Sequence, residues 1–176
     1  MARHPQYFIL TGEVRSGKTR LLVEAAKILK NSGLRLNGLA CPEHREGAAH
    51  NGYDGLNVRS GDTFALARID GDPGWERSGP YYFLPLGLTL ANQAITNFDQ
   101  TDLTIIDEVG PLEMAGGGLR PGLDTVFRQP KSALIVARRS LVSQLSEMIS
   151  YPYIDYDIED KNCLEYMIED IQRLTK

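Results

Sequence analysis

The sequence predicts an α/β fold, with a parallel sheet of about five core strands and helices on both faces. Apolar, strand-like runs alternate with segments of helical periodicity, and a glycine-rich phosphate-binding motif joins the first strand to the first helix. An acidic pair, Asp107 and Glu108, directly follows a later apolar strand. Ligands of such sheets bind at the carboxyl ends of the strands, so the motif and the acidic pair are expected to face each other.

Composition is typical of a globular protein. The 176 residues are sufficient for a hydrophobic core, and we expect residues 1–176 to form a single domain. Hydrophobic residues make up 42% and charged residues 24% of the chain. The formal net charge of −4 argues against binding to nucleic acid, which usually requires a basic face.

The sequence also predicts a cytoplasmic protein without a membrane partner. No apolar run approaches the length of a membrane span, and the N-terminus lacks the apolar stretch of a signal peptide. The two cysteines, Cys41 and Cys163, have no metal-binding spacing. We expect both to be reduced thiols, as is usual in cytosolic proteins.

Residues 11–19 read Thr-Gly-Glu-Val-Arg-Ser-Gly-Lys-Thr and fit the phosphate loop G-x-x-x-x-G-K-[ST], or Walker A motif, at every fixed position. Residues 7–10 predict a buried strand before the loop, and residues 20–30 carry apolar side chains at helical spacing after it. The motif requires this strand–loop–helix context, which a plain glycine turn does not. We therefore predict that the chain binds a nucleoside triphosphate.

Each fixed residue of the loop has a physical role in this prediction. Gly12 and Gly17 allow the backbone N–H groups to approach phosphate oxygens at the positive end of the helix. Lys18 supplies a charge for the β- and γ-phosphates, and the hydroxyl of Thr19 is suited to coordinate Mg²⁺. Arg15 lies either across the phosphates or in solvent. The predicted nucleotide-binding residues are Gly12, Glu13, Val14, Arg15, Ser16, Gly17, Lys18 and Thr19.

Beyond the first helix, turn residues and periodicity predict the next elements. Gly33 is expected to end the first helix as its C′ residue, and residues 34–41 predict the second strand. Residues 43–61 are polar and rich in glycine, and the short strand candidates and turns that follow predict a small β-rich insertion over residues 43–84. Within it, the step Asn51-Gly52 is typical of a type I′ hairpin turn.

The remaining chain returns to alternating helices and strands. The predicted elements are helices over residues 86–98, 122–128, 140–149 and 162–174, and strands over residues 103–106, 133–137 and 153–158. Residues 109–121 are rich in glycine and proline and predict a loop. Ser140 is the expected N-cap of the helix that follows it.

The strand over residues 103–106 and the acidic pair after it match a Walker B element. Asp107 is expected to hold Mg²⁺ opposite Thr19, directly or through a water. Glu108 would then orient or deprotonate an attacking water. The structural alternative is that the pair belongs to a solvated turn or caps a helix.

Three further charged residues are candidates for the same site. Glu113 follows in the adjacent loop, either near the substrate or in solvent. Arg138 and Arg139 end the strand after the Walker B element, where a guanidinium could reach the γ-phosphate in the course of catalysis. Alternatively, they form a surface pair at the start of the next helix.

Several short motifs occur in one order along most of the chain. They are the phosphate loop, Asn37-Gly38-Leu39, Glu43, Arg45-Glu46-Gly47, Gly52-Tyr53-Asp54, Leu66-Ala67-Arg68, and Asp107-Glu108-Val109-Gly110-Pro111-Leu112-Glu113. This order resembles the small nucleoside-triphosphatase family first described in thermophiles, also called cancer-related nucleoside-triphosphatases. The resemblance implies a RecA-like P-loop fold with a β-hairpin insertion. It also implies Mg²⁺-dependent hydrolysis of the terminal phosphate of ATP, GTP and other nucleotides, with a loose base preference.

The resemblance carries over to residues 12–19 for the nucleotide, to Thr19 and Asp107 for the metal and to Glu108 as the base. The chain departs from the family pattern at residues 48–51 and 72–80, which leaves its base and partner preferences open. Two alternative functions remain. One is a small-molecule or nucleotide kinase with the same phosphate loop, and the other is a regulatory protein gated by a nucleotide, whose protein partner is unknown.

Overall fold

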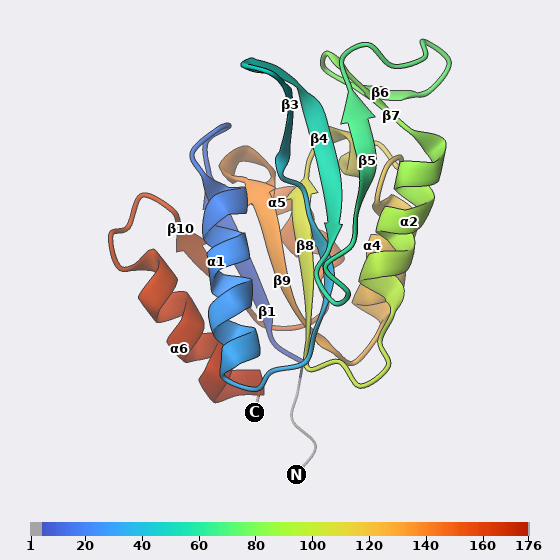
Figure 1. Cartoon of the computed structure of the whole chain (residues 1–176). Coiled ribbons are helices and arrows are strands. Elements are labelled where there is room, and N and C mark those ends of the chain that lie inside the picture. The colour runs from blue at the N-terminus through green and yellow to red at the C-terminus, as the bar shows by residue number, and fades with distance from the viewer. Residues whose placement is uncertain (1–4, 176) are drawn as a thin grey trace.

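A computed structural model describes residues 5–175, and Figure 1 shows its strands in one twisted sheet. The parallel strands of this sheet are β1 (Tyr7–Gly12), β2 (Leu36–Ala40), β8 (Leu103–Val109), β9 (Ser132–Arg138) and β10 (Tyr153–Asp157). They lie in the order β10-β1-β9-β8-β2, and every adjacent pair is parallel. The predicted parallel core is therefore confirmed.

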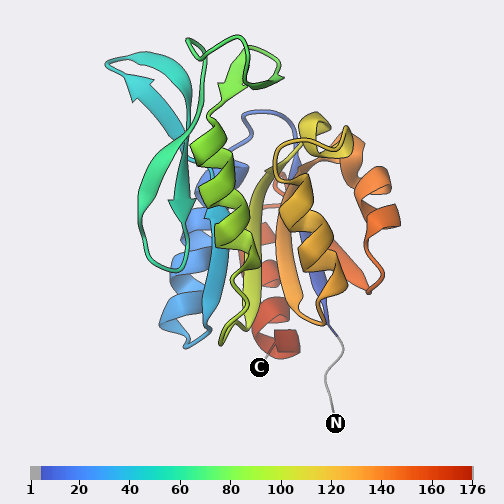
Figure 2. The ribbon, with the colours of Figure 1, turned by 90° about the vertical axis from the view of Figure 1, so that its right-hand side faces the viewer.

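Helices cover both faces of these parallel strands (Figures 1 and 2). On one face lie α1 (Lys18–Asn31) and α6 (Cys163–Thr175), and on the other lie α2 (Pro85–Thr96), α4 (Arg120–Arg128) and α5 (Val142–Met148). Alternate residues of β1 point to opposite faces, with Phe8 packed in the α1–α6 cluster and Ile9 in the other. Because both faces are covered, the core strands read as continuous apolar runs.

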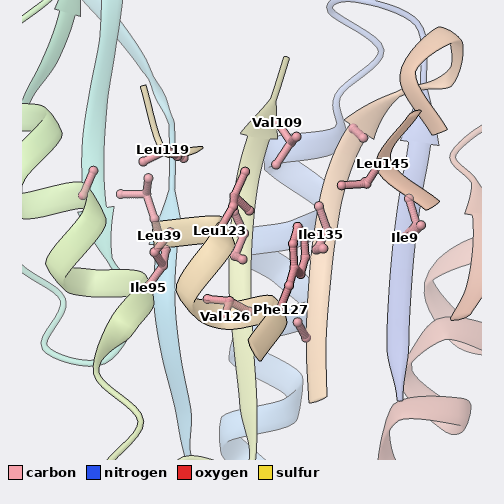
Figure 3. Packing of buried hydrophobic residues seen from close by; sticks show 14 of the residues in the cluster. Ile9, Leu39, Ile95, Val109, Leu119, Leu123, Val126, Phe127, Ile135 and Leu145 are labelled. Atoms are coloured by element: carbon pink, nitrogen blue, oxygen red, sulfur yellow. The ribbon is translucent and has the colours of Figure 1, made fainter. Parts of the chain in front are cut away.

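Figure 3 shows the face that α2, α4 and α5 cover, where side chains of these helices pack against those of the sheet. Leu123 and Val126 of α4 pack over the sheet together with Ile95 of α2. All three side chains are fully buried, and so is Ile135 of β9, which lies beneath them. Burial of this kind stabilises the fold by about 1.5–3 kcal/mol for each large apolar side chain.

The insertion adds antiparallel strands to the β2 edge of the same sheet. Its strands are β3 (Glu43–Glu46), β4 (Ala49–Asn57), β5 (Thr63–Arg68), β6 (Glu76–Ser78) and β7 (Tyr81–Phe83). They continue the sheet in the order β2-β4-β5-β7-β6, with β3 paired to β4. The β3–β4 hairpin rises beyond the carboxyl ends of the parallel strands (Figure 1). The insertion is thus an extension of the core sheet and larger than a single hairpin.

The prediction of a hairpin turn at Asn51-Gly52 is wrong. The turn between β3 and β4 lies at Gly47 and Ala48, and Gly52 lies within β4. Gly52 has a φ of 134°, and a Cβ there would lie 2.0 Å from the carbonyl oxygen of Ala67 on β5. Glycine is therefore required at this position by the close approach of two strands.

The start of α5 also differs from the prediction. A 3₁₀ turn, η1 (Arg139–Leu141), precedes α5, and Leu141 is its N-cap, so Ser140 does not cap the helix. The predicted loop contains the short helix α3 (Pro111–Met114). Gly33 follows α1 with a φ of 91°, as expected of a C′ glycine. Within residues 5–175, no helix has the length and apolar character needed to cross a membrane.

Candidate functional site

The phosphate loop lies between the buried strand β1 and the first turn of α1. Gly17 precedes α1 with a φ of 90°, and Arg15 also has a positive φ, of 60°. At Gly12 a Cβ would lie 2.4 Å from the side chain of Ile158 and 2.8 Å from the hydroxyl of Ser16. These conformations leave residues 13–17 exposed, with the N-terminus of α1 behind them, an arrangement that favours anions.

Lys18 is the buried cation of this loop. Its ammonium group donates to the carbonyl oxygens of Gly12 at 3.1 Å and Glu13 at 2.5 Å. Burial lowers the pKa of Lys18, while the nearby charges of Glu108 and Asp107 oppose that shift. The lysine charge is thus held within the loop that would receive the phosphates.

Asp107 lies at the carboxyl end of β8, one strand away from β1 across β9. Its carboxylate is fully buried, and its Oδ2 accepts a hydrogen bond of 2.9 Å from the backbone N–H of Cys41. Among the described residues, Oδ1 has no hydrogen-bond partner. Burial, and then the charge of Glu108, raise the pKa of Asp107 to about 7, while the side chain of Thr19 lowers it.

The donor set at this point fits a magnesium ion. A buried oxygen without a partner is unfavourable unless a proton or a cation satisfies it. The hydroxyl of Thr19 and the carboxylate of Asp107 are the hard oxygen ligands that Mg²⁺ prefers, and the phosphates of a nucleotide would supply more. Thr19 and Asp107 are therefore the residues of this site that could hold the metal.

Glu108 projects from the same strand end but is exposed. Its φ is 62°, and the register between β8 and β9 shifts between Ile106 and Val109. A residue other than glycine in this conformation is unfavourable by about 1–2 kcal/mol. Strain of this kind is typical of active sites, where the surrounding structure holds it.

The two consecutive arginines have different surroundings. Arg138 is level with Gly12 in the β1–β9 pair and lines the cavity above the phosphate loop. The guanidinium of Arg139 instead donates to Asp157 at 2.5 Å and lies 3.7 Å from Glu159. Of this pair, the geometry brings Arg138 to the site and directs Arg139 to the turn after β10.

A cavity of about 1020 Å³ joins the phosphate loop to the insertion. Beyond Lys18, Arg138 and Glu108, its wall includes Glu43, Tyr53 and Tyr81 of the insertion. The rings of Tyr53 and Tyr81 meet edge to face with centroids 5.0 Å apart, and the hydroxyl of Tyr81 lies 2.9 Å from the Nε2 of His50. The insertion thus provides an aromatic wall opposite the loop.

A protein-family model described as NTPase matches residues 7–168, which is most of the chain. The chain belongs to this NTPase family. Three relatives are each named nucleoside-triphosphatase THEP1. The protein of Sulfolobus acidocaldarius is 31% identical over 137 residues, covering 78% of this chain and 79% of its own length. The protein of Hyperthermus butylicus is 33% identical over 153 residues, which cover 84% of this chain and 75% of the relative. That of Methanopyrus kandleri is 35% identical over 111 residues, with 62% of this chain and only 61% of the relative covered.

Two solved structures share the NTPase fold. The solution structure of a human cancer-related nucleoside triphosphatase matches with a TM-score of 0.70 at 22% identity, over 98% of this chain and 97% of the other. The crystal structure of THEP1 from Aquifex aeolicus matches with a TM-score of 0.66 at 20% identity, over 97% of this chain and 99% of the other. The predicted P-loop fold and the resemblance to the small nucleoside-triphosphatases are thus confirmed.

Within this candidate site, the structure brings together the phosphate loop, Asp107, Glu108 and Arg138. The wall formed by Glu43, Tyr53 and Tyr81 was not among the predicted site residues. The aromatic residues of the insertion are the signal that could have indicated this wall, but the hairpin turn expected at Gly52 gave the wrong course for β4. Glu113 does not line the cavity and is buried instead.

Proposed function

We propose that the protein hydrolyses nucleoside 5′-triphosphates, ATP and GTP with a loose base preference, to the diphosphate and phosphate in a Mg²⁺-dependent reaction. The observation that carries this proposal is that Lys18 of the phosphate loop and Glu108 of the Walker B strand line the same cavity. Membership of the NTPase family and the names of the relatives support it. Neither nucleic acid nor a membrane is a partner in this proposal.

Binding of the triphosphate would depend on the loop from Gly12 to Thr19. The backbone N–H groups before α1 donate to phosphate oxygens, and the ammonium of Lys18 exchanges loop carbonyls for the β- and γ-phosphates. Thr19 and Asp107 would hold Mg²⁺, which when bound neutralises charge on the β- and γ-phosphate oxygens.

Glu108 would orient a water molecule beside the γ-phosphate and accept its proton. The water oxygen forms a bond to the γ-phosphorus as the bond from that phosphorus to the β–γ bridging oxygen breaks, so that the diphosphate leaves. Arg138 and Lys18 donate to the oxygens on which negative charge develops. Because Arg139 is paired with Asp157, the catalytic arginine in this proposal is Arg138.

Two features bear on the finer parts of the proposal. The relatives are named as nucleoside-triphosphatases, without reference to one base, which supports a loose base preference. Cys41 and Cys163 are free, buried thiols, which is consistent with the reducing environment of the cytoplasm, where we place the protein.

A panel of ATP, GTP, CTP and UTP tests the proposed function. We expect release of phosphate from ATP and GTP with Mg²⁺, loss of that release with EDTA, and a large loss in the Glu108→Gln variant. The matched control, Glu147→Gln, removes a carboxylate of α5 that does not line the cavity. No phosphate from any nucleotide, or an unaffected Glu108→Gln variant, would contradict the proposal.

A phosphotransferase is the second candidate, and one observation favours it. The cavity continues from Glu108 to Glu43, Tyr53 and Tyr81, which leaves room beside the γ-phosphate for an acceptor hydroxyl. Addition of cell metabolites to the ATP assay separates the two reactions. A kinase would form ADP in excess of free phosphate, whereas a hydrolase forms the two in equal amounts.

A further inference from the structure

Glu113 is a buried carboxylate in the loop that follows the acidic pair. It lies in α3, only 4% of the residue is exposed, and it does not line the cavity. Its Oε2 accepts a hydrogen bond of 2.9 Å from the backbone N–H of Gly110, and its Oε1 accepts one of 3.2 Å from that of Leu119. One carboxylate therefore joins the beginning and the end of the loop.

The burial of Glu113 is unfavourable in itself. Burial raises the pKa of its carboxyl group, and the hydrogen bonds from Gly110 and Leu119 only partly oppose that shift. The carboxylate forms no ion pair with a lysine or arginine of residues 5–175, and Arg120 donates to the backbone carbonyl of Glu113 instead. A buried carboxylate is unfavourable unless hydrogen bonds satisfy it, and among the described residues only backbone N–H groups do so here. The carboxylate and the backbone at Gly110 and Leu119 therefore hold each other in position.

The loop that Glu113 joins begins two residues after Glu108. Glu108 has a φ of 62°, Val109 is buried in the ladder with β9, and Gly110 is the donor to Glu113. An unfavourable backbone conformation persists only where the surrounding structure holds it in place. Asp107 and β8 hold Glu108 on its N-terminal side, and the contact between Gly110 and Glu113 holds it on the other.

We propose that Glu113 is a positioning residue for hydrolysis, which holds the backbone after Glu108 so that the Glu108 carboxylate faces the phosphate loop. This inference rests on the role of Glu108 in the proposed function. Glu113 itself does not line the cavity, and in this proposal it acts only through Gly110 and Leu119.

Glu113→Gln is the first test, since the amide keeps the shape of the side chain. Its NH₂ group cannot accept from a backbone N–H, so one end of the loop is released. We expect kcat to fall about ten- to hundredfold, as for other small displacements of a catalytic group, with KM and nucleotide affinity within about twofold of the wild type. Glu113 does not contact the nucleotide, so a purely structural defect would lower the fraction of folded protein rather than kcat per bound site.

Two glycines of the same loop offer a matched pair that leaves Glu113 in place. Gly118 and Gly116 have φ values of 58° and 95°, so alanine is strained at both. A Cβ at Gly118 would lie 2.3 Å from Oε1 of Glu113, whereas a Cβ at Gly116 meets nothing within 4 Å. We expect Gly118→Ala to lower kcat like Glu113→Gln and Gly116→Ala to retain it.

A double-mutant cycle separates this inference from the proposed function. If Glu113 acts through Glu108, Glu113→Gln lowers kcat in the wild type but by less than about twofold in the Glu108→Gln background. Equal losses in both backgrounds, or equal losses in Gly118→Ala and Gly116→Ala, would overturn the positioning role. A Glu108→Gln variant as active as the wild type would instead overturn the role of Glu108 in the proposed function.

Discussion

The guanidinium of Arg139, which follows β9, donates a hydrogen bond of 2.5 Å to the carboxylate of Asp157. Asp157 ends β10, which is separated from β9 by β1. Glu159 and Glu13 lie 3.7 Å and 3.9 Å from the same guanidinium. Arg138, the preceding residue, lines the cavity above the phosphate loop. The 3₁₀ turn that begins at Arg139 directs the two neighbouring side chains to different places.

This separation predicts unequal effects of alanine at the two positions. Arg138→Ala should lower kcat at least about tenfold, because a cation near the γ-phosphate stabilises charge that develops during transfer. Arg139→Ala should lower kcat by much less, since the Arg139 guanidinium is bonded to the carboxylate of Asp157 and its removal leaves Arg138 in place. Phosphate release at saturating ATP measures both. A larger loss in Arg139→Ala would show that its pairing with Asp157 is exchanged for a phosphate contact.

The positive φ of Glu108 predicts that replacing this residue with glycine makes the protein more stable but inactive. Glycine adopts this conformation without strain, so Glu108→Gly should raise the free energy of unfolding by about 1 kcal/mol. The same variant should lose hydrolysis, because it has no carboxylate to orient water. Glu108→Gln keeps the strain and serves as the control. Urea unfolding compares the two, and a glycine variant no more stable than the glutamine variant would contradict the expectation.

The unpartnered Oδ1 of Asp107 predicts a specific metal phenotype. Asp107→Asn preserves the shape of the side chain but removes the charge that a divalent cation requires. We expect the Mg²⁺ concentration for half-maximal hydrolysis to rise at least about tenfold. Binding of a fluorescent ATP analogue without metal should persist, since Lys18 and the loop are intact. Unchanged Mg²⁺ dependence would exclude Asp107 as a ligand.

The ion pair between Arg35 and Asp102 predicts a contribution to stability that depends on pH. Arg35 donates to the Asp102 carboxylate from its backbone N–H at 2.8 Å and from its side chain at 2.7 and 3.0 Å. These hydrogen bonds lower the pKa of Asp102. A lowered pKa gives stability that is present above the unfolded-state value of about 3.9 and is lost as the pH falls through the folded-state value.

Asp102→Asn should therefore unfold at lower urea than the wild type at neutral pH. The difference should shrink on acidification to about pH 3 and below, where the wild-type carboxylate also becomes protonated. Urea titrations at the two pH values measure it. A difference of the same size at both would mean that the charge of Asp102 is not involved.

Local pattern was sufficient for the elements that form the phosphate-binding half of the site. Strand β1, the loop to Thr19 and helix α1 are adjacent in sequence, so their periodicity and glycines directly indicate their structure. The β8 strand that carries Asp107 is equally recognisable, because both faces of a parallel core strand are buried.

Features that depend on distant parts of the chain were not predictable in this way. Gly52 is required by the carbonyl of Ala67 in another strand, and no local pattern separates that need from a turn. The burial of Glu113 depends on donors at both ends of its loop. The contact between Tyr53 and Tyr81 likewise depends on the folding of β7 against β5.

The hydrogen bond from the backbone N–H of Cys41 to Asp107 joins the end of β8 to the residues just before the insertion. Cys41 is the first residue after β2, and the insertion begins two residues later with β3. If Asp107 holds a cation as proposed, we expect cation binding and the orientation of the insertion to be coupled through this peptide N–H. By reciprocity, a ligand that fixes the insertion changes the affinity for the metal by the same factor that the metal changes the affinity for that ligand.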